Sequence, residues 1–214
     1  MNDNRNYKYT ETSQTVRNEY KIIQSWIPRG SKVIDLGCGD GSLLKLLQQN
    51  DVQGEGIDVA ATAVKSAKRK GIKIKQGIID TKLNYKENQF DFAICTVTLQ
   101  MVMYPEKVIG EMKRIAKELI ISIPNFGFIA NRIDLFFFGR MPRPMLFGYN
   151  WFSTGHIHQL SLSDFERFCK DHNLVIIKRV PFVFGQLGKL PSIILSKSPN
   201  LWASSALYHL KKGS

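Results

Sequence analysis

Cysteine is scarce in this chain. Its three cysteines, Cys38, Cys95 and Cys169, lie far apart, and no two of them form a C-x-x-C pair. This argues against a disulfide framework and against a zinc site. His156 and His158 flank Ile157, but no set of acids or cysteines stands beside them in the sequence. We therefore expect no metal, and three reduced, mostly buried thiols.

Long apolar runs are also missing. Stretches such as LIISIPNFGFIA and IDLFFFGRM are short or interrupted, whereas a helix that crosses a bilayer needs roughly 20 consecutive apolar residues. The first residues, MNDNRNYKYTETSQ, are polar and lack the apolar core of a secretion signal. We expect no membrane span and a cytoplasmic location, with residues 1–15 as a flexible tail.

Acidic residues are fewer than basic ones in this chain. The 30 lysines and arginines against 18 acids give a formal net charge of +12, a balance that favours anionic partners such as nucleic acid. The basic residues are scattered, however, and do not gather beside aromatic ones. A lysine-rich, solvated surface is the interpretation we prefer, and nucleic-acid binding is the alternative.

What the sequence does contain is an alternation of strand-like and helix-like segments. Short β-rich runs and helical stretches follow one another, which is typical of a doubly wound, mostly parallel sheet with a Rossmann-like fold. The chain is long enough for one core, so residues 1–214 are predicted to form a single domain. Seven strands are expected, the last of them antiparallel, at residues 32–36, 54–59, 72–79, 90–97, 119–124, 174–184 and 203–212. Helices are expected at 16–28, 42–50, 60–71, 106–118 and 162–173, the last one capped by Ser161 or Ser163.

An insertion interrupts this pattern after the fifth strand. Residues 125–160 are rich in aromatics and arginine and are long for a connection inside a domain, so we expect them to be a lid or a partner interface. Packing in the core is the alternative. Candidates for contact with an acceptor or a partner are Asn125, Asn131, Arg132, Arg140 and Arg143.

The most informative stretch is VIDLGCGDGSLLKLL, in which a strand runs into Gly37, Gly39 and Gly41 and then into a helix. Glycines allow a ligand to approach the backbone, but dinucleotide sites use the same geometry with the spacing G-x-G-x-x-G. Here the spacing is G-x-G-x-G. Asp35 and Asp40 would repel a pyrophosphate and suit the ammonium and sulfonium groups of S-adenosylmethionine (SAM).

Asp58 supports the same interpretation. It ends the second strand about 20 residues after the loop, where a carboxylate can accept hydrogen bonds from both ribose hydroxyls. The alternatives are that Asp35 caps a turn and that Asp58 caps the helix that follows. The remaining residues that we expect to contact the cofactor are Cys38, Val59, Ile78, Ile79, Asp80 and Thr96.

At these residues the chain resembles class I SAM-dependent methyltransferases, and more specifically the MetW family. The similarity covers roughly residues 18–212 and includes WIPRGSKVIDLGCGDGSLL, FDFAICTVTLQ, SIPNFGFIANRIDL, GRMP and ALYHLKK. It implies SAM, or S-adenosylhomocysteine as product, and a role in methionine biosynthesis beside homoserine O-acetyltransferase. The family brings no defined methyl acceptor with it.

One departure from related proteins concerns adenine. Where they carry an acid in a QGD pattern, this chain has Gln76, Gly77 and Ile78. Asp80 either replaces that acid or begins a turn. The backbone of Ile78 and Ile79 offers another way to read the adenine edge.

The sequence identifies no catalytic residue with certainty. Methyl transfer needs positioning more than acid–base chemistry, so a missing base excludes nothing. Gln100 and His158 are weak candidates, and each has a structural alternative, as a helix cap or as a hydrogen-bonded histidine. An N-P-P-Y motif and a Pro-Cys nucleophile are missing, which disfavours nucleic-acid methylation. Two hypotheses remain ahead of it: a SAM-binding accessory protein of methionine synthesis and a small-molecule methyltransferase.

Overall fold

The computed structural model describes residues 18–142, 151–152, 154–183, 195 and 197–213. It divides the chain into two compact units, one within residues 6–121 and one within 122–214, with the division inside strand β5 (Ala116–Pro124). Each unit is described by itself. The single domain that the sequence predicts stays a prediction.

The strands form one seven-stranded sheet in the order β3-β2-β1-β4-β5-β7-β6. β1 (Lys32–Leu36) pairs in parallel with β2 (Gln53–Asp58) and β4 (Phe90–Thr96), and β2 pairs in parallel with β3 (Lys73–Gln76). β7 (Ser205–Lys212) runs antiparallel to β6 (Leu174–Phe182). The predicted doubly wound sheet is confirmed.

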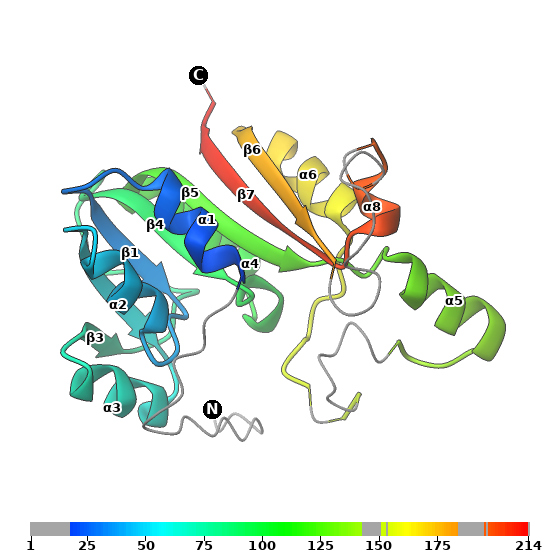
Figure 1. Ribbon diagram of the computed structural model, residues 1–214, viewed down its shortest axis with the longest axis horizontal. Coiled ribbons are helices and arrows are strands. Elements are labelled where there is room, and N and C mark those ends of the chain that lie inside the picture. Colours follow the sequence, from blue (N-terminus) through cyan, green and yellow to red (C-terminus); the bar gives the residue numbers. More distant parts are fainter. Residues whose placement is uncertain (1–17, 143–150, 153, 184–194, 196, 214) are drawn as a thin grey trace. The chain divides into compact units, whose positions relative to one another are not determined.

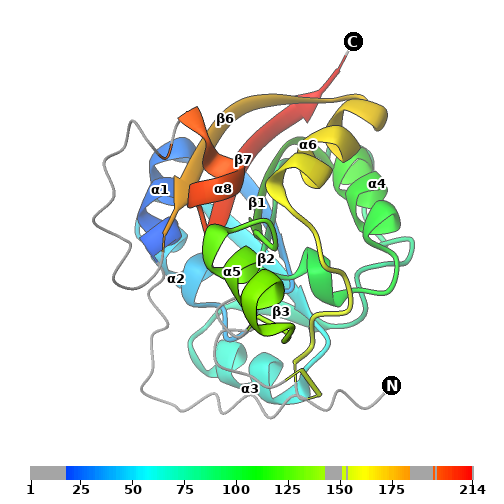
Figure 2. The ribbon, with the colours of Figure 1, turned by 90° about the vertical axis from the view of Figure 1, so that its right-hand side faces the viewer.

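In the first unit, helices cover both faces of the sheet. α1 (Asn18–Trp26) and α2 (Ser42–Gln48) lie on one face and α4 (Pro105–Ile115) on the other (Figures 1 and 2). α3 (Ala61–Arg69) packs on β3, and the 3-10 turn η1 (Leu99–Met101) contacts α4. Three leucines of α2 (Leu43, Leu44 and Leu47) and the apolar residues of β1 are almost completely buried, and they form the core under the glycine loop.

Two glycines in β2 let α2 come close to the sheet. A Cβ at Gly54 would lie 2.8 Å from Leu44 Cδ2, and a Cβ at Gly56 would lie 2.5 Å from Cys38 Sγ. Real Cβ atoms essentially never come this near to another heavy atom. The glycines therefore set the distance between β2 and the loop that precedes α2.

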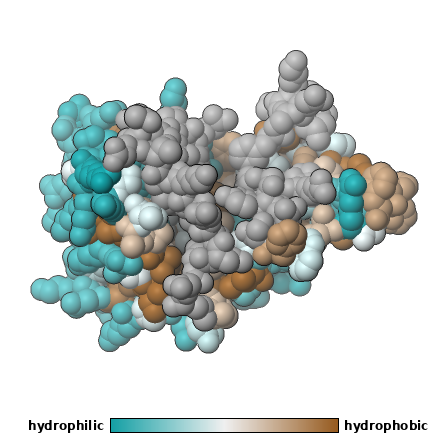
Figure 3. Space-filling view, turned by 90° about the horizontal axis from the view of Figure 1, so that it is seen from below, coloured by the Kyte–Doolittle hydropathy of each residue, from teal (hydrophilic) through white to brown (hydrophobic). Residues whose placement is uncertain are grey.

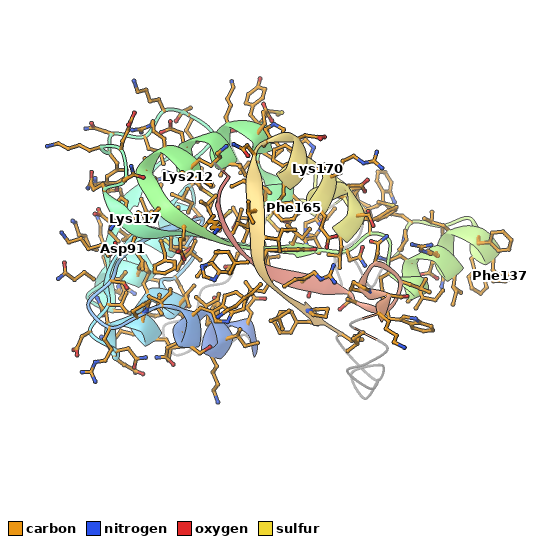
Figure 4. All side chains as sticks on the ribbon, turned by 90° about the horizontal axis from the view of Figure 1, so that it is seen from above. Asp91, Lys117, Phe137, Phe165, Lys170 and Lys212 are labelled. Carbon is orange, nitrogen blue, oxygen red and sulfur yellow. The ribbon has the colours of Figure 1, made fainter. Side chains whose placement is uncertain are left out.

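In the second unit, α6 (Leu162–Asp171) is anchored to the strands by a polar cluster. Glu166 Oε1 accepts a hydrogen bond from the Tyr208 hydroxyl at 3.0 Å and pairs with Arg179 Nη1 at 2.7 Å. The Phe165 ring packs against Tyr208, with centroids 4.9 Å apart (Figure 4 labels Phe165). Burial, followed by the charge on Glu166, raises the pKa of Tyr208, so its hydroxyl stays protonated and donates.

The N-terminus of α6 gives a first prediction. Ser161 Oγ accepts from the Asp164 amide, and the Asp164 carboxylate accepts from the Ser161 amide, which is the capping box that the sequence predicted for Ser161 or Ser163. We expect Ser161→Ala to lower the free energy of unfolding by about 1 kcal/mol. Ser163→Ala should leave it nearly unchanged in the same urea titration. Equal losses in both variants would contradict the assignment of the cap.

Three predicted boundaries or segments differ from the structure. α4 ends at Ile115 and β5 begins at Ala116, because pairing in the sheet overrides the helix propensity of the Ala-Lys-Glu run. The third strand ends at Gln76 rather than at residue 79. Helices α5 (Ile129–Phe138) and α8 (Pro199–Trp202) lie where no regular structure was predicted.

Candidate functional site

The glycine loop lies at the carboxyl ends of β1 and β2. Gly37, Gly39 and Gly41 have φ angles of 78°, 55° and 72°, which lie in the left-handed region that glycine adopts without strain. The amide of Gly37 donates to the carbonyl of Ile57 at 2.8 Å. The loop therefore turns sharply and stays attached to the end of β2.

The segment after β4 packs directly on this loop. A Cβ at Gly37 would lie 2.4 Å from Thr98 Cγ2 and 2.5 Å from Thr98 Oγ1, so Gly37 leaves no room for a side chain. Val97, which precedes Thr98, has a φ of 51°, which is a rare conformation for a β-branched residue. Such strain collects at ligand-binding and catalytic sites, and it was not visible in the sequence.

Asp58 holds the loop from the end of β2. Its Oδ2 accepts from the amide of Gly39 at 2.7 Å, and its Oδ1 accepts from the amide of Ala60 at 2.9 Å. Ala60 is the N-cap of α3, and this helix has no side-chain cap hydrogen bond, so Asp58 anchors the residue before α3 but does not cap the helix. Asp58 thus stands at the carboxyl end of β2, in contact with both the glycine loop and the start of α3.

The two acids of the loop region differ from each other. Asp35 is 1% exposed and lies near the loop, and its charge contributes to raising the pKa of Cys38. Asp40 pairs with Lys70 Nζ at 2.5 Å and accepts from the Ser42 amide at 3.1 Å. We expected both acids to attract a cationic ligand. Lys70 compensates the charge of Asp40, so Asp35 is the acid left for this role.

Cys38 is a buried thiol in the middle of the loop. Burial raises its pKa, and the nearby charges of Asp35, Asp58 and Asp40 add to this shift. The thiol stays protonated at neutral pH and is a poor nucleophile. We assign it packing against Gly56 rather than chemistry.

Apolar side chains stand at the ends of β2 and β3. Val59 is 44% exposed and Ile78 is 56% exposed, whereas Ile79 is buried. Asp80 Oδ2 accepts a hydrogen bond from the Tyr104 amide at 3.3 Å, which ties this loop to the start of α4. The role of Asp80 toward adenine stays a prediction.

Thr96, the last residue of β4, is buried, and Gln100 in η1 is 1% exposed. Gln100 Nε2 donates to the carbonyl of Val97 at 3.0 Å, so its amide supports the strained turn. The helix cap considered for Gln100 is not formed, because Gln100 lies inside η1, which has no side-chain cap hydrogen bond. The catalytic role considered for Gln100 stays a prediction.

The buried asparagines of the insertion form hydrogen bonds within the second unit. Asn125 Nδ2 donates to the carbonyls of Asn200 and Ala203, and its Oδ1 accepts from the amides of Gly127 and Leu162. Asn131, 1% exposed, donates to the carbonyls of Asn125 and Phe126.

The charged and aromatic candidates of this segment are more exposed. Arg132 donates to the Gly127 carbonyl, and Arg140 pairs with Asp134 at 2.8 Å. Arg143 lies outside the described residues, and His158 is half-buried. Among the residues that the structure describes, no three histidines, cysteines, aspartates or glutamates gather as metal ligands, and no helix is long and apolar enough to cross a membrane.

Among the predicted cofactor residues, hydrogen bonds and close contacts join Gly37, Cys38, Gly39 and Asp58 at the carboxyl ends of β1 and β2, and their role toward a cofactor stays a prediction. Lys70 and Val97 were not predicted. Lys70 lies 30 residues from Asp40 in a lysine-rich helix end, where the sequence carries no signal for one particular lysine.

The chain is similar in sequence to proteins of methionine biosynthesis. A family model described as "Methionine biosynthesis protein MetW" matches residues 17–210. A bifunctional methionine biosynthesis protein MetXA/MetW of Rhodopirellula baltica is 28% identical over 222 residues, which are 97% of this chain and 34% of that protein. A carboxy-S-adenosyl-L-methionine synthase of Campylobacter curvus is 29% identical over 134 residues, 50% of this chain and 57% of that one. The chain thus spans between a third and somewhat over half of these curated relatives.

Solved structures of SAM-dependent methyltransferases share the fold. The enzyme from Thermotoga maritima has a TM-score of 0.65 at 16% identity and covers 91% of this chain and 87% of its own. The one from Mesorhizobium loti has a TM-score of 0.64 at 13% identity, with 94% and 100% covered. The fold is therefore that of class I SAM-dependent methyltransferases, and the match over residues 17–210 shows that this chain belongs to the MetW family of methionine biosynthesis proteins.

Proposed function

We propose that this chain binds SAM at the carboxyl ends of β1, β2, β3 and β4, and that it serves methionine biosynthesis as a partner of homoserine O-acetyltransferase. The observation that carries the donor site is Asp58. Its carboxylate is fixed by two backbone amides, at 2.7 and 2.9 Å, at the end of β2, where an acid can accept hydrogen bonds from both ribose hydroxyls.

The other residues fit the remaining parts of SAM. Val59 and Ile78 offer exposed apolar side chains to the faces of the adenine ring. Gly37 and Gly39 let the backbone approach the donor, and the negative charge of Asp35 favours its cationic methionyl end. SAM supplies an electrophilic methyl group when bound, and the residues of this chain hold and orient it.

The partner is supported by the relative from Rhodopirellula baltica, whose printed name joins MetXA and MetW in one protein. Joining two proteins in one chain raises their effective concentration for each other to the millimolar range, so it favours pairs that work in contact. We take the MetXA part as the acyltransferase. SAM is made from the product of the pathway. It would then regulate the activity of an early enzyme of that pathway through this chain.

The test is a reconstituted assay of the acyltransferase from the same genome. We expect an equimolar amount of this chain to change the rate of acetyl transfer to homoserine, and saturating SAM to shift that rate again by on the order of fivefold. S-adenosylhomocysteine and buffer serve as controls. If neither the chain nor SAM changed the rate of the acyltransferase, the accessory role would be contradicted. SAM binding itself is tested separately, by calorimetry.

A second candidate is an active small-molecule methyltransferase. The strained Val97 beside the donor loop favours it, because strain of this kind is kept where chemistry or tight binding requires it. Labelled SAM incubated with cell extract should then yield a labelled small product. An RNA methyltransferase rests on the net charge alone, and RNA affinity that does not fall steeply with salt would eliminate it.

A further inference from the structure

Helix α5 buries polar side chains and exposes most of its apolar ones. Its two buried residues, Asn131 and Asp134, are polar, and its large apolar residues are exposed. Ile133 (43% exposed), Phe136 (82%) and Phe137 (69%) lie at positions i, i+3 and i+4, so they share one face, which we call the Phe surface. Leu135 (42%) and Phe138 (62%) are exposed on other sides of the helix. Figure 4 shows Phe137 at the far end of α5, and Figure 3 shows hydrophobic colours at the position of this helix.

The buried polar side chains hold this helix in its orientation. Asn131 donates to the carbonyls of Asn125 and Phe126 at 3.1 and 3.2 Å, which fixes the first turn. Asp134 pairs with Arg140, whose guanidinium lies 4.8 Å from the Phe138 ring centre, and Gly139 ends the helix with a φ of 57°. The Phe surface is therefore preorganised, which lowers the entropic cost of binding.

The surface is large enough to matter. Each phenylalanine buries on the order of 150–250 Å² when it is covered, and this surface holds two of them beside Ile133. A typical stable interface takes about 800 Å² from each partner. The Phe surface supplies the apolar centre of such an interface, and the ring pair Phe136–Phe137, with centroids 4.9 Å apart, presents a ready anchor.

We propose that the Phe surface of α5 is where this chain docks on the acyltransferase, an inference that rests on the proposed function. The fused relative covers 97% of this chain and carries a second, longer protein, which makes that protein the occupant with the best support. Residues 122–214 contain eleven lysines and arginines against four acids. The surface on the partner should accordingly be an apolar recess with an acidic rim.

Two other occupants fit less well. A helix that lies on an anionic membrane carries several basic residues on its polar face, whereas α5 has one arginine, Arg132, and one acid, Asp134. A second copy of this chain would bring a surface with the same excess of basic residues close to the first. Like charges disfavour that pairing.

The experiment compares two double variants in binding to the immobilised acyltransferase. Phe136→Ser with Phe137→Ser should weaken binding at least about 30-fold, because buried aromatic anchors dominate interfaces. Val175→Ser with Ile177→Ser removes two exposed apolar residues (43% and 40%) from β6 in the same unit, and should change the Kd less than about twofold. Both variants should melt near the wild type, since the side chains replaced are exposed.

Several outcomes overturn the proposal, and they can be told apart. Equal binding by wild type and the Phe variant would reject the surface while keeping the partner. No binding by the wild type would reject the partner and the surface together, with SAM titration deciding the donor site separately. A dimer in sedimentation, or binding to anionic vesicles, that disappears in the Phe variant would assign the surface to a second copy or to lipid.

Discussion

Replacing Asp58 by alanine should weaken SAM binding by on the order of a hundredfold or more. The carboxylate is proposed to accept hydrogen bonds from two ribose hydroxyls, and each bond to a charged acceptor contributes about 1.5–3 kcal/mol. The substitution also removes the anchors of the Gly39 and Ala60 amides. Calorimetry with SAM on both proteins gives the two dissociation constants directly.

A matched variant separates the ribose contact from order in the loop. Asp40 also holds the loop, through the Ser42 amide and Lys70, but it has no proposed contact with the donor. Asp40→Asn should keep SAM affinity within about fivefold, because it leaves the ribose acceptor in place. Asp51→Ala, on the surface, should have no effect, since that side chain is 67% exposed. If Asp40→Asn lost binding as fully as Asp58→Ala, loop order and not the ribose contact would explain the result.

Gly37→Ala should lower the free energy of unfolding by about 3 kcal/mol. Two causes combine: a φ of 78° strains any L-residue by roughly 1 kcal/mol, and overpacking against Thr98 adds about 1–3 kcal/mol. For a chain of this size the loss corresponds to a decrease in Tm of about 6–12 °C. Thermal melts followed by circular dichroism measure it.

Gly30 supplies the control for this prediction. It has the same φ of 78°, but nothing lies within 4 Å of a Cβ built there. Gly30→Ala should therefore show the backbone strain alone, about 1 kcal/mol. Adding Thr98→Ala to Gly37→Ala should restore part of the loss, because it removes the two nearest atoms. Identical melts for Gly30→Ala and Gly37→Ala would show that the contact with Thr98 is not tight.

The sequence was most informative where local chemistry decides the structure. The glycine spacing predicted the turn after β1, and Ser161 with Asp164 formed the predicted cap of α6. Asp58 lies at the end of β2, as the pattern indicated. These features depend on neighbours in the chain, so a single sequence carries them.

Features that depend on distant contacts were missed. The Asp40–Lys70 pair joins residues 30 apart, and only the packing of α3 beside the loop selects this lysine among many. Helix α5 was not predicted because its apolar residues are consecutive and show no helical period. The left-handed Val97 carries no signal either, since valine normally avoids this conformation.

The central claim is that the acids and glycines at the ends of β1 and β2 select a cationic nucleoside donor over a phosphate-bearing one. Titrating the wild-type chain in a calorimeter with SAM and then with NAD tests it most directly. We expect saturable heat and a rise in Tm with SAM, and neither with NAD. Binding of NAD without binding of SAM would contradict the account.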